Sequence, residues 1–247
     1  MAGLYESSTY GDRIAHSYDG LEQFTPEQTQ AEVDGLAALA KNGPVLELGI
    51  GTGRVALPLK EKGIEVHGID ASSKMIEELC RKPGGDAIPV TIGDFSELAV
   101  DGQFSLIYIV FNTFFALLSQ EAQVRCFANA AAHLAADGLF VIEAFVPDPS
   151  RFTRNQNIVV SKVGMNEVRF DVSHHDPLLQ RVIAQHVVIT EKHTQFFPVQ
   201  MRYAWPSEMD LMAQLAGLRL KERWSNWQRL PFTSSSTAHI SLYESAD

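Results

Sequence analysis

Three glycines on alternate positions, Gly49, Gly51 and Gly53, directly follow a short apolar run and most limit how this chain can fold. The apolar run, residues 45–48, is typical of a buried parallel strand. A turn almost without side chains lets a ligand lie directly against the backbone. The apolar positions of 55–59 then recur at helical spacing. The segment therefore predicts a strand, a ligand-binding turn and a helix in succession.

The glycine spacing differs from the dinucleotide-binding pattern Gly-x-Gly-x-x-Gly. The third glycine comes one position early, and Arg54 stands where that pattern has glycine. Glu47 lies two residues before the first glycine, which gives acid-x-Gly-x-Gly-x-Gly. This sequence resembles the first motif of class I S-adenosylmethionine-dependent methyltransferases. A glycine-rich turn of another α/β domain is the alternative that this motif alone leaves open.

Two further predicted strands also end in an acidic residue. The apolar strand 64–69 ends at Asp70, about twenty residues past the glycines, where a carboxylate can accept hydrogen bonds from a ribose diol. The next strand is followed by Gly93, Asp94 and Phe95, and an aspartate there can accept from an adenine amino group. A single aspartate is more commonly a cap or turn residue. Three such features in order favour the methyltransferase interpretation.

The resemblance implies a cofactor and a set of residues that bind it. The cofactor is S-adenosyl-L-methionine, with Asp70 on the ribose hydroxyls and Met75 against the adenine, although ordinary core packing also accounts for a methionine there. The expected cofactor-binding residues are Tyr10, Tyr18, Glu47, Gly49, Gly51, Gly53, Asp70, Ala71, Met75, Gly93, Asp94, Phe95 and Phe111.

Alternating strands and helices predict the fold class of the core. Strands are expected at 104–111 and 138–145, and helices at 26–41 and 119–136. Such alternation predicts an α/β fold with a Rossmann-like, doubly wound, mostly parallel sheet. Ligands of these sheets bind beyond the carboxyl ends of the strands, which is where the glycines and the acidic residues lie.

The periodicity changes after about residue 155, where apolar residues alternate at period two. This pattern predicts an antiparallel β insert. We expect an N-terminal lid segment over 1–24, a cofactor-binding core over 25–150 and 206–247, and an insert over 151–205 that covers the acceptor pocket. The architecture resembles the small-molecule branch of the family, including sugar N,N-dimethyltransferases.

The amino-terminal segment is rich in tyrosine. In small-molecule methyltransferases a similar segment folds over the cofactor, and this resemblance implies that Tyr10 reaches the methionine part of the cofactor or the acceptor. Tyr18 would then line the lid. The alternative is that both tyrosines pack a surface helix, because amphipathic aromatic packing is common.

Composition limits the class of protein further. The chain has 247 residues, 45% hydrophobic and 20% charged, and a net charge of −10. This charge disfavours nucleic-acid binding and phosphate-rich acceptors. No run is apolar enough to span a membrane, and the N-terminus does not resemble a signal peptide, so we expect a cytoplasmic enzyme. Cys80 and Cys126 lack metal-like spacing, so we expect buried thiols and no metal site. The oligomeric state stays open, with a homodimer as one alternative.

Methyl transfer needs little acid–base chemistry, because a sulfonium is already an activated electrophile. The protein must align a nucleophile, exclude water and, where required, remove a proton. Sugar amine methyltransferases can place a histidine after the fourth strand, but residues 111–117 contain none. The substitutes are Tyr10, Glu22, Glu143, His174, His175 and His186, of which Tyr10, Glu22 and His174 are the expected catalytic residues. Neighbours on a strand point to opposite faces, so at most one of His174 and His175 faces the pocket.

Polar and aromatic side chains near the predicted pocket point to the acceptor. The expected acceptor-binding residues are Asn112, Phe114, Phe115, Phe145, Tyr203 and Trp205. Aromatic side chains bind flat ring systems or cations. We therefore expect methyl transfer to N, C or O of a small-molecule amine or aromatic acceptor, an indole-like one included. The alternatives are an NAD-dependent oxidoreductase and a catalytically silent cofactor-binding regulatory protein.

Overall fold

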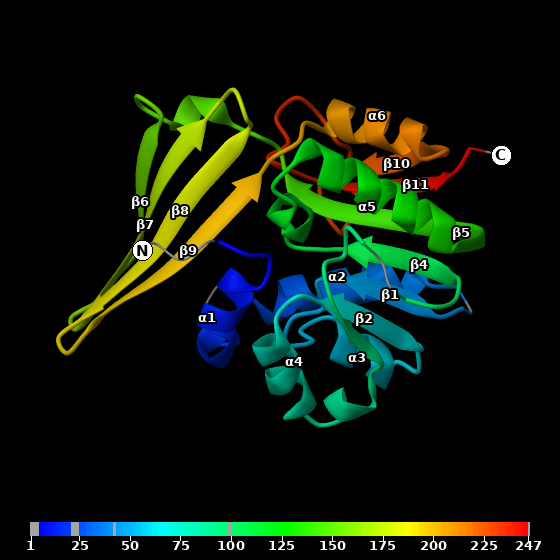
Figure 1. The fold of residues 1–247 in the computed structure, drawn as a ribbon, viewed down its shortest axis with the longest axis horizontal. Coiled ribbons are helices and arrows are strands. Elements are labelled where there is room, and N and C mark those ends of the chain that lie inside the picture. The colour runs from blue at the N-terminus through cyan, green and yellow to red at the C-terminus, as the bar shows by residue number, and fades with distance from the viewer. Residues whose placement is uncertain (1–4, 21–24, 42, 98–99, 247) are drawn as a thin grey trace.

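The computed structural model describes residues 5–20, 25–41, 43–97 and 100–246 and contains two sheets (Figure 1). A seven-stranded sheet lies on the right of the view, and a four-stranded antiparallel sheet lies on the left. This arrangement confirms the predicted mixed α/β class with an additional antiparallel sheet. The division into lid, core and insert stays a prediction about domains.

The large sheet is parallel except for one strand near its edge. Its order is β10-β11-β5-β4-β1-β2-β3, and β11 runs antiparallel to both of its neighbours. The strands are β1 (Val45–Leu48), β2 (Val66–Asp70), β3 (Val90–Ile92), β4 (Phe104–Ile109), β5 (Leu134–Phe145), β10 (Leu218–Trp224) and β11 (Ala238–Ser245). The carboxyl ends of β1 to β4 therefore meet at one edge of the sheet.

Six α-helices and three short 3-10 helices pack around the sheets in the described ranges. The α-helices are α1 (Thr9–Tyr18), α2 (Pro26–Leu39), α3 (Ala56–Glu61), α4 (Ser73–Cys80), α5 (Gln120–His133) and α6 (Pro206–Leu215). The 3-10 helices are η1 (Gly85–Ala87), η2 (Thr113–Ala116) and η3 (Pro149–Arg151).

Side-chain caps fix the start of two long helices. Thr25 and Gln28 form a reciprocal capping box at the start of α2, and Ser119 accepts from the backbone N–H of Ala122 at 3.1 Å. Helix α5 ends at His133, earlier than predicted. The backbone becomes extended at Leu134, because this residue already pairs with Phe104 of β4.

Apolar side chains cover both faces of the large sheet. One face packs against α5 and α6, and the other packs against α2 and α3. Phe127 of α5 lies in the centre of the first layer, with its ring 5.5 Å from Phe114, 5.2 Å from Phe140 and 5.3 Å from Tyr243. These edge-to-face contacts join helix, sheet and the turn after β4 into one core.

The four-stranded sheet is formed by β6 (Gln156–Val163), β7 (Glu167–Asp176), β8 (Arg181–Thr190) and β9 (Thr194–Arg202). A buried cluster joins it to the core. The Arg202 guanidinium donates to Gln123 of α5 and, at 2.7 Å, to Glu208 of α6. Since these partners hold the end of β9, the sheet has a fixed orientation relative to the core.

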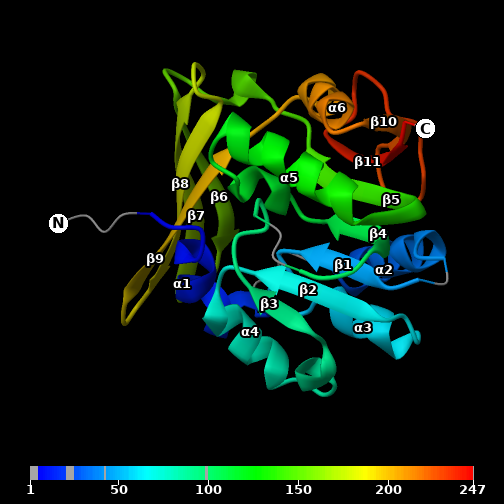
Figure 2. The same cartoon turned by 45° about the vertical axis from the view of Figure 1, so that its right-hand side comes forward.

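Helix α1 lies between the two sheets, against α4 and β9 (Figure 2). Tyr5, just before it, accepts a hydrogen bond from the backbone N–H of Gln200 at 3.1 Å. The amino-terminal segment therefore bridges the gap between core and insert.

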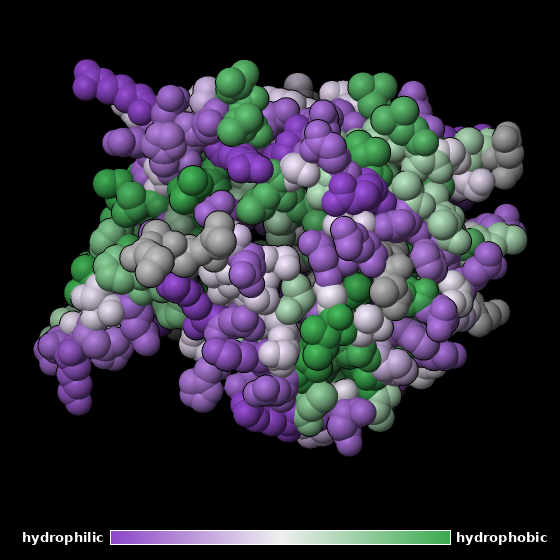
Figure 3. Space-filling model, in the orientation of Figure 1, coloured by the Kyte–Doolittle hydropathy of each residue, from purple (hydrophilic) through white to green (hydrophobic). Residues whose placement is uncertain are grey.

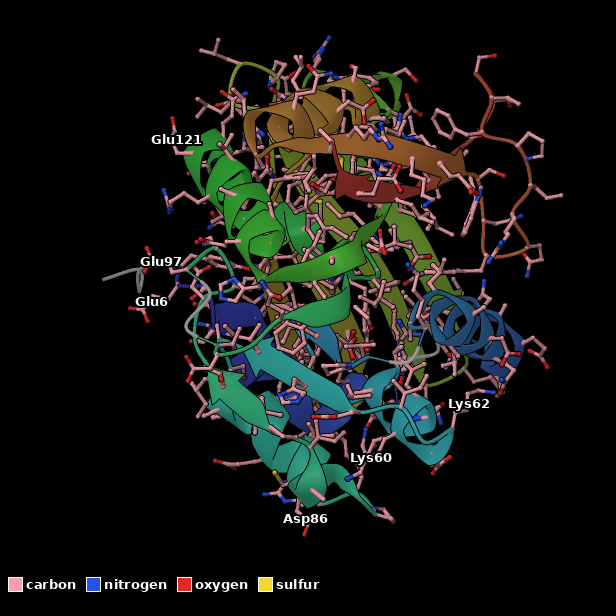
Figure 4. The ribbon with its side chains drawn as sticks, turned by 90° about the vertical axis from the view of Figure 1, so that its right-hand side faces the viewer. Glu6, Lys60, Lys62, Asp86, Glu97 and Glu121 are labelled. Atoms are coloured by element: carbon pink, nitrogen blue, oxygen red, sulfur yellow. The ribbon has the colours of Figure 1, made fainter. Side chains whose placement is uncertain are left out.

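The surface is mixed, with apolar patches among hydrophilic ones (Figure 3). Charged side chains such as Glu121, Lys62 and Asp86 lie at the periphery (Figure 4). Within the described ranges, no helix has the length and apolar character needed to cross a membrane. Cys126 is buried as expected, but Cys80 is exposed at the end of α4, which corrects that prediction.

Phe127→Ala should lower the free energy of unfolding by about 3–5 kcal/mol, because it leaves a cavity among three aromatic rings. Equilibrium urea denaturation measures this change. Leu211→Ala on α6 is the control, because its side chain is 60% exposed and its removal should cost less than about 0.5 kcal/mol. Equal losses in the two variants would contradict this description of the core.

Candidate functional site

A cavity of about 720 Å³ opens where the carboxyl ends of the parallel strands face the four-stranded sheet. Its floor is the glycine turn after β1 together with Asp70 and Asp94, and α1 covers one side. The opposite wall consists of side chains from β7, β8 and β9. The cavity therefore has one wall from the core and one from the insert.

The glycine turn adopts a backbone that other residues rarely adopt. Gly49 and Gly51 both have positive φ, at 81° and 55°. A Cβ on Gly51 would meet no atom within 4 Å, so it would project into open space in the cavity. A Cβ on Gly49 would lie 2.4 Å from the Thr113 side chain. Gly51 thus leaves room for a ligand at the backbone, as the motif predicted.

Asp70 holds this turn in place. Its two carboxylate oxygens accept from the backbone N–H groups of Gly51 and Ser72, each at 2.8 Å. Burial raises the pKa of the Asp70 carboxyl, and these two N–H donors lower it. The Ser72 hydroxyl in turn donates to Asp12 of α1 at 2.7 Å. The carboxylate lines the cavity with further lone pairs available to a ligand.

Most of the predicted cofactor-binding residues lie together around this cavity. Besides Gly49, Gly51 and Asp70, those that line it are Tyr10, Tyr18, Ala71, Met75, Asp94, Phe95 and Phe111. Asp94 is held by the backbone N–H of Ser96, which donates to it at 2.7 Å. Met75 both lines the cavity and packs with Ile14 and Phe197, so its two expected roles are compatible.

Three residues expected to bind the cofactor are not among the residues that line the cavity. Gly53 faces Leu79, where a Cβ would lie 2.4 Å from its Cδ1, so this glycine serves packing. Gly93 donates its N–H to the carbonyl of Asp70 at 2.9 Å. Glu47 is 3% exposed and accepts from the Tyr108 hydroxyl at 2.9 Å.

The turn after β4 is strained and firmly held. Phe111 and Asn112 both have positive φ, at 53° and 64°. The Glu143 carboxylate accepts from the N–H of Phe111 at 3.1 Å, and the Asn112 side chain accepts from Phe145 at 2.7 Å. Burial and the neighbouring Glu32 raise the pKa of Glu143 to about 7. Glu143 therefore supports the turn from behind, and Asn112 lines the cavity as predicted.

The tyrosines of the amino-terminal segment face the cavity with protonated hydroxyls. Burial raises the pKa of Tyr18 to about 12. Burial also raises the pKa of Tyr10, and the neighbouring Tyr18, Tyr5 and Asp171 add to that shift. A phenol in this state donates a hydrogen bond but is a poor proton acceptor at neutral pH. The raised pKa of Tyr10 therefore favours positioning by this residue over proton removal.

Five of the expected acceptor-binding side chains lie elsewhere, which corrects that prediction. Phe114 and Phe115 are fully buried in the core, and Phe145 packs against Phe115 with ring centroids 4.8 Å apart. Tyr203 is buried against His175, and Trp205 is 40% exposed beside α6. Near η2 the cavity wall is formed instead by the small or aliphatic side chains of Ala116, Leu117, Leu118 and Ala122.

The histidines also differ from expectation. His174 is exposed and does not line the cavity. Its position therefore does not fit the catalytic role that the sequence analysis expected for it. His175, on the other face of β7, is buried and hydrogen-bonded to the Tyr203 hydroxyl at 2.9 Å. His186 of β8 lines the cavity and is hydrogen-bonded to Asp171 of β7. Glu22 lies outside the described residues.

Sequence reasoning named His186 only as one of several substitutes and missed Asp171. The sequence contained a signal for this pair: apolar residues alternate with other residues in the segments of β7 and β8, and a turn at Asp176-Pro177 joins the two segments. The hairpin pairs Asp176 with Arg181, which places Asp171 directly opposite His186. Counting residues from the turn gives the register of the hairpin, and this register would have predicted that Asp171 and His186 lie side by side.

The buried Glu47 generates a pH-dependent prediction. Burial raises its pKa from 4.5 to about 8, so between these values the folded protein holds a proton that the unfolded chain releases. Its contribution to stability is complete below pH 4.5 and is lost as the pH rises to about 8, by about 1.4 kcal/mol per pH unit.

Glu47→Gln has no proton to lose, so its free energy of unfolding should fall less steeply across this window. Urea denaturation at several pH values measures the slope, with the exposed Glu61→Gln as control. A parent-like slope in Glu47→Gln would contradict the raised pKa.

Comparisons with known proteins agree with this geometry. Residues 45–138 match the family model described as "Methyltransferase domain". The solved CcbJ methyltransferase from Streptomyces caelestis is 38% identical, with a TM-score of 0.91 over 98% of this chain and 100% of that one.

Two curated relatives also match. The cypemycin N-terminal methyltransferase of a Streptomyces species is 27% identical over 81% of this chain and 82% of its own length. The dTDP-3-amino-3,6-dideoxy-alpha-D-glucopyranose N,N-dimethyltransferase of Streptomyces fradiae is 27% identical over 54% of both chains. The alternative of an NAD-dependent oxidoreductase is therefore wrong. The chain belongs to the class I S-adenosylmethionine-dependent methyltransferases, which confirms the family, enzyme class and cofactor expected from its sequence.

Proposed function

We propose that this enzyme methylates the nitrogen of a small-molecule amine. The observation that carries the proposal is the Asp171–His186 pair on the wall of a cavity rich in aromatic side chains. A carboxylate and aromatic faces both attract an ammonium group. The cavity also has the size of a small-molecule site. The relatives that act on an amino terminus and on an amino sugar support the same acceptor atom.

The cofactor residues follow from the shape of the cavity floor. S-adenosylmethionine supplies a methyl group already activated on its sulfonium sulfur. The open space at Gly51 accommodates the cofactor against the backbone, and Asp70 accepts from the ribose hydroxyls. Asp94 would accept from the adenine amino group, and Met75 and Phe95, which line the same cavity, would contact the ring.

The amino-terminal segment and the insert together enclose the acceptor. Tyr5 and Tyr10 line the cavity between the two sheets, and Asp12 ties α1 to Ser72 beside the ribose-binding Asp70. Such a cover excludes water and brings the amine into line with the methyl group, which is most of what the reaction requires.

A panel of amines tests this proposal against the alternative of a catalytically silent protein. Radiolabelled methyl transfer is measured to a dTDP-3-amino-3,6-dideoxyhexose, a tripeptide with a free amino terminus, and tryptamine. The matched controls are the 3-hydroxy sugar nucleotide, the N-acetylated tripeptide and tryptophol. We expect label in at least one amine and none in its control. Label only in hydroxyl or carbon acceptors, or none at all, would contradict N-methylation.

Asp70→Ala should weaken S-adenosylmethionine binding by about 5-fold to about 150-fold, because unpaired polar groups cost about 1–3 kcal/mol each. Asp94→Ala should weaken it too and reduce the preference for S-adenosylhomocysteine over S-inosylhomocysteine. Calorimetry measures both affinities. Asp86→Ala, at an exposed acid on η1, is the control. Parent-like affinity in either site variant would exclude the role proposed for that residue.

A further inference from the structure

We propose that His186 takes the proton from the acceptor amine and that Asp171 orients its imidazole for this step. The inference rests on the proposed function, which it deepens by assigning the proton acceptor. Its basis is the position of the two side chains on the inner face of the four-stranded sheet, where both line the cavity.

The hydrogen bond between the two residues determines which imidazole nitrogen is available. Nδ1 of His186 is bonded to Oδ1 of Asp171. An ionised carboxylate only accepts, so Nδ1 carries a hydrogen, and in the neutral imidazole Nε2 then keeps its lone pair. A carboxylate that holds a histidine in one tautomer and orientation is the arrangement used by general bases.

The surroundings of His186 suit an amine that enters the cavity. The Tyr10 ring of α1 lies 6.4 Å from the imidazole at an interplanar angle of 61°, and Phe197 of β9 pairs opposite His186. The His186 and Asp171 side chains are 33% and 38% exposed, and both line the cavity, so a ligand there can reach them. The other charged groups on this wall are Arg169, which pairs with Glu167, and Lys162.

The remaining candidates among the described residues are less suited to this role. His174 is on the exposed face of β7, and His175 is buried, stacked on Phe152 and hydrogen-bonded to Tyr203. Tyr10 faces the cavity, but burial raises the pKa of its hydroxyl far above neutrality. Glu143 faces the backbone of the Phe111 turn.

The step balances in protons and electrons. The acceptor arrives as an ammonium ion, and Nε2 of His186 removes one proton to leave a neutral amine. The amine lone pair then forms the N–C bond while the S–C bond breaks and its electron pair stays on sulfur. The products are the methylated ammonium ion and S-adenosylhomocysteine, and the imidazolium releases its proton to solvent when the product leaves.

Kinetics with the best amine of the panel test the inference. His186→Gln should lower kcat by about 100-fold or more, the range for losing a general base, while S-adenosylmethionine affinity by calorimetry stays at the parent value. Added imidazole should restore turnover to His186→Gly but not to His186→Gln, where the side chain still fills the site. A merely structural histidine would show no such rescue. His193→Gln, an exposed histidine on the β8–β9 turn, is the matched control.

A second measurement needs no acceptor. Nitrogen-15 NMR of the parent protein bound to S-adenosylhomocysteine should show the His186 tautomer with hydrogen on Nδ1 and none on Nε2. The Asp171→Asn variant should lose this preference in the same spectra. In the kinetic assay with the amine it should also turn over more slowly than the parent, because a wrong tautomer removes the lone pair from the cavity.

Each contrary outcome has its own meaning. Parent-like turnover in His186→Gln, a loss in His186→Gly without imidazole rescue, or a neutral imidazole with its hydrogen on Nε2 would overturn the role of His186. Loss of activity in His174→Gln together with retained activity in His186→Gln would also overturn the role of His186. The general base would then be His174, on the other face of β7. No labelled product from the parent with any amine would contradict the proposed function itself.

Discussion

The Asp70 carboxylate is the interaction on which the rest of the site depends. It joins the backbone N–H of Gly51, in the turn after β1, to that of Ser72, at the start of α4. Ser72 extends the connection to Asp12 and therefore to α1. This one partly buried acid thus connects the floor of the cavity to its cover through hydrogen bonds from two backbone N–H groups.

The opposite wall depends on a separate polar cluster. Arg202, at the end of β9, is held by Gln123 and Glu208, which belong to two different helices of the core. Because all of these groups are largely buried, breaking one pair would leave an uncompensated charge. This cluster keeps the inner face of the four-stranded sheet, with Asp171 and His186, directed at the glycine turn.

The glycine turn and the acidic strand ends could be placed from sequence because each is a local feature. A strand of apolar residues followed by Gly49 and Gly51 specifies a turn that only glycine adopts easily, and Asp70 ends the next strand along the chain. The rule that parallel strands share one ligand edge then brought these residues to the same cavity. Glu47 and Gly53 belong to the same motif, yet the Glu47 side chain is buried and Gly53 packs against Leu79, which spacing alone does not reveal.

The acceptor side was predicted less well, because it depends on how distant segments pack. Phe114 and Phe115 follow β4 directly, but the backbone of η2 turns both rings into the core, and aromatic composition does not specify that rotation. His174 and His186 are both strand histidines, and only the register and the face of the sheet turned toward the core decide which one reaches the cavity.

The sequence by itself therefore determined the fold class, which follows from the hydrophobic period and the order of strands along the chain. It determined the cofactor through the resemblance of its glycine motif and acidic strand ends to those of methyltransferases. Only the tertiary structure decided which side chains form the far wall. That wall results from contacts between α1, the insert and α5 that are remote in sequence, so their geometry is set by packing and buried hydrogen bonds rather than by any local pattern.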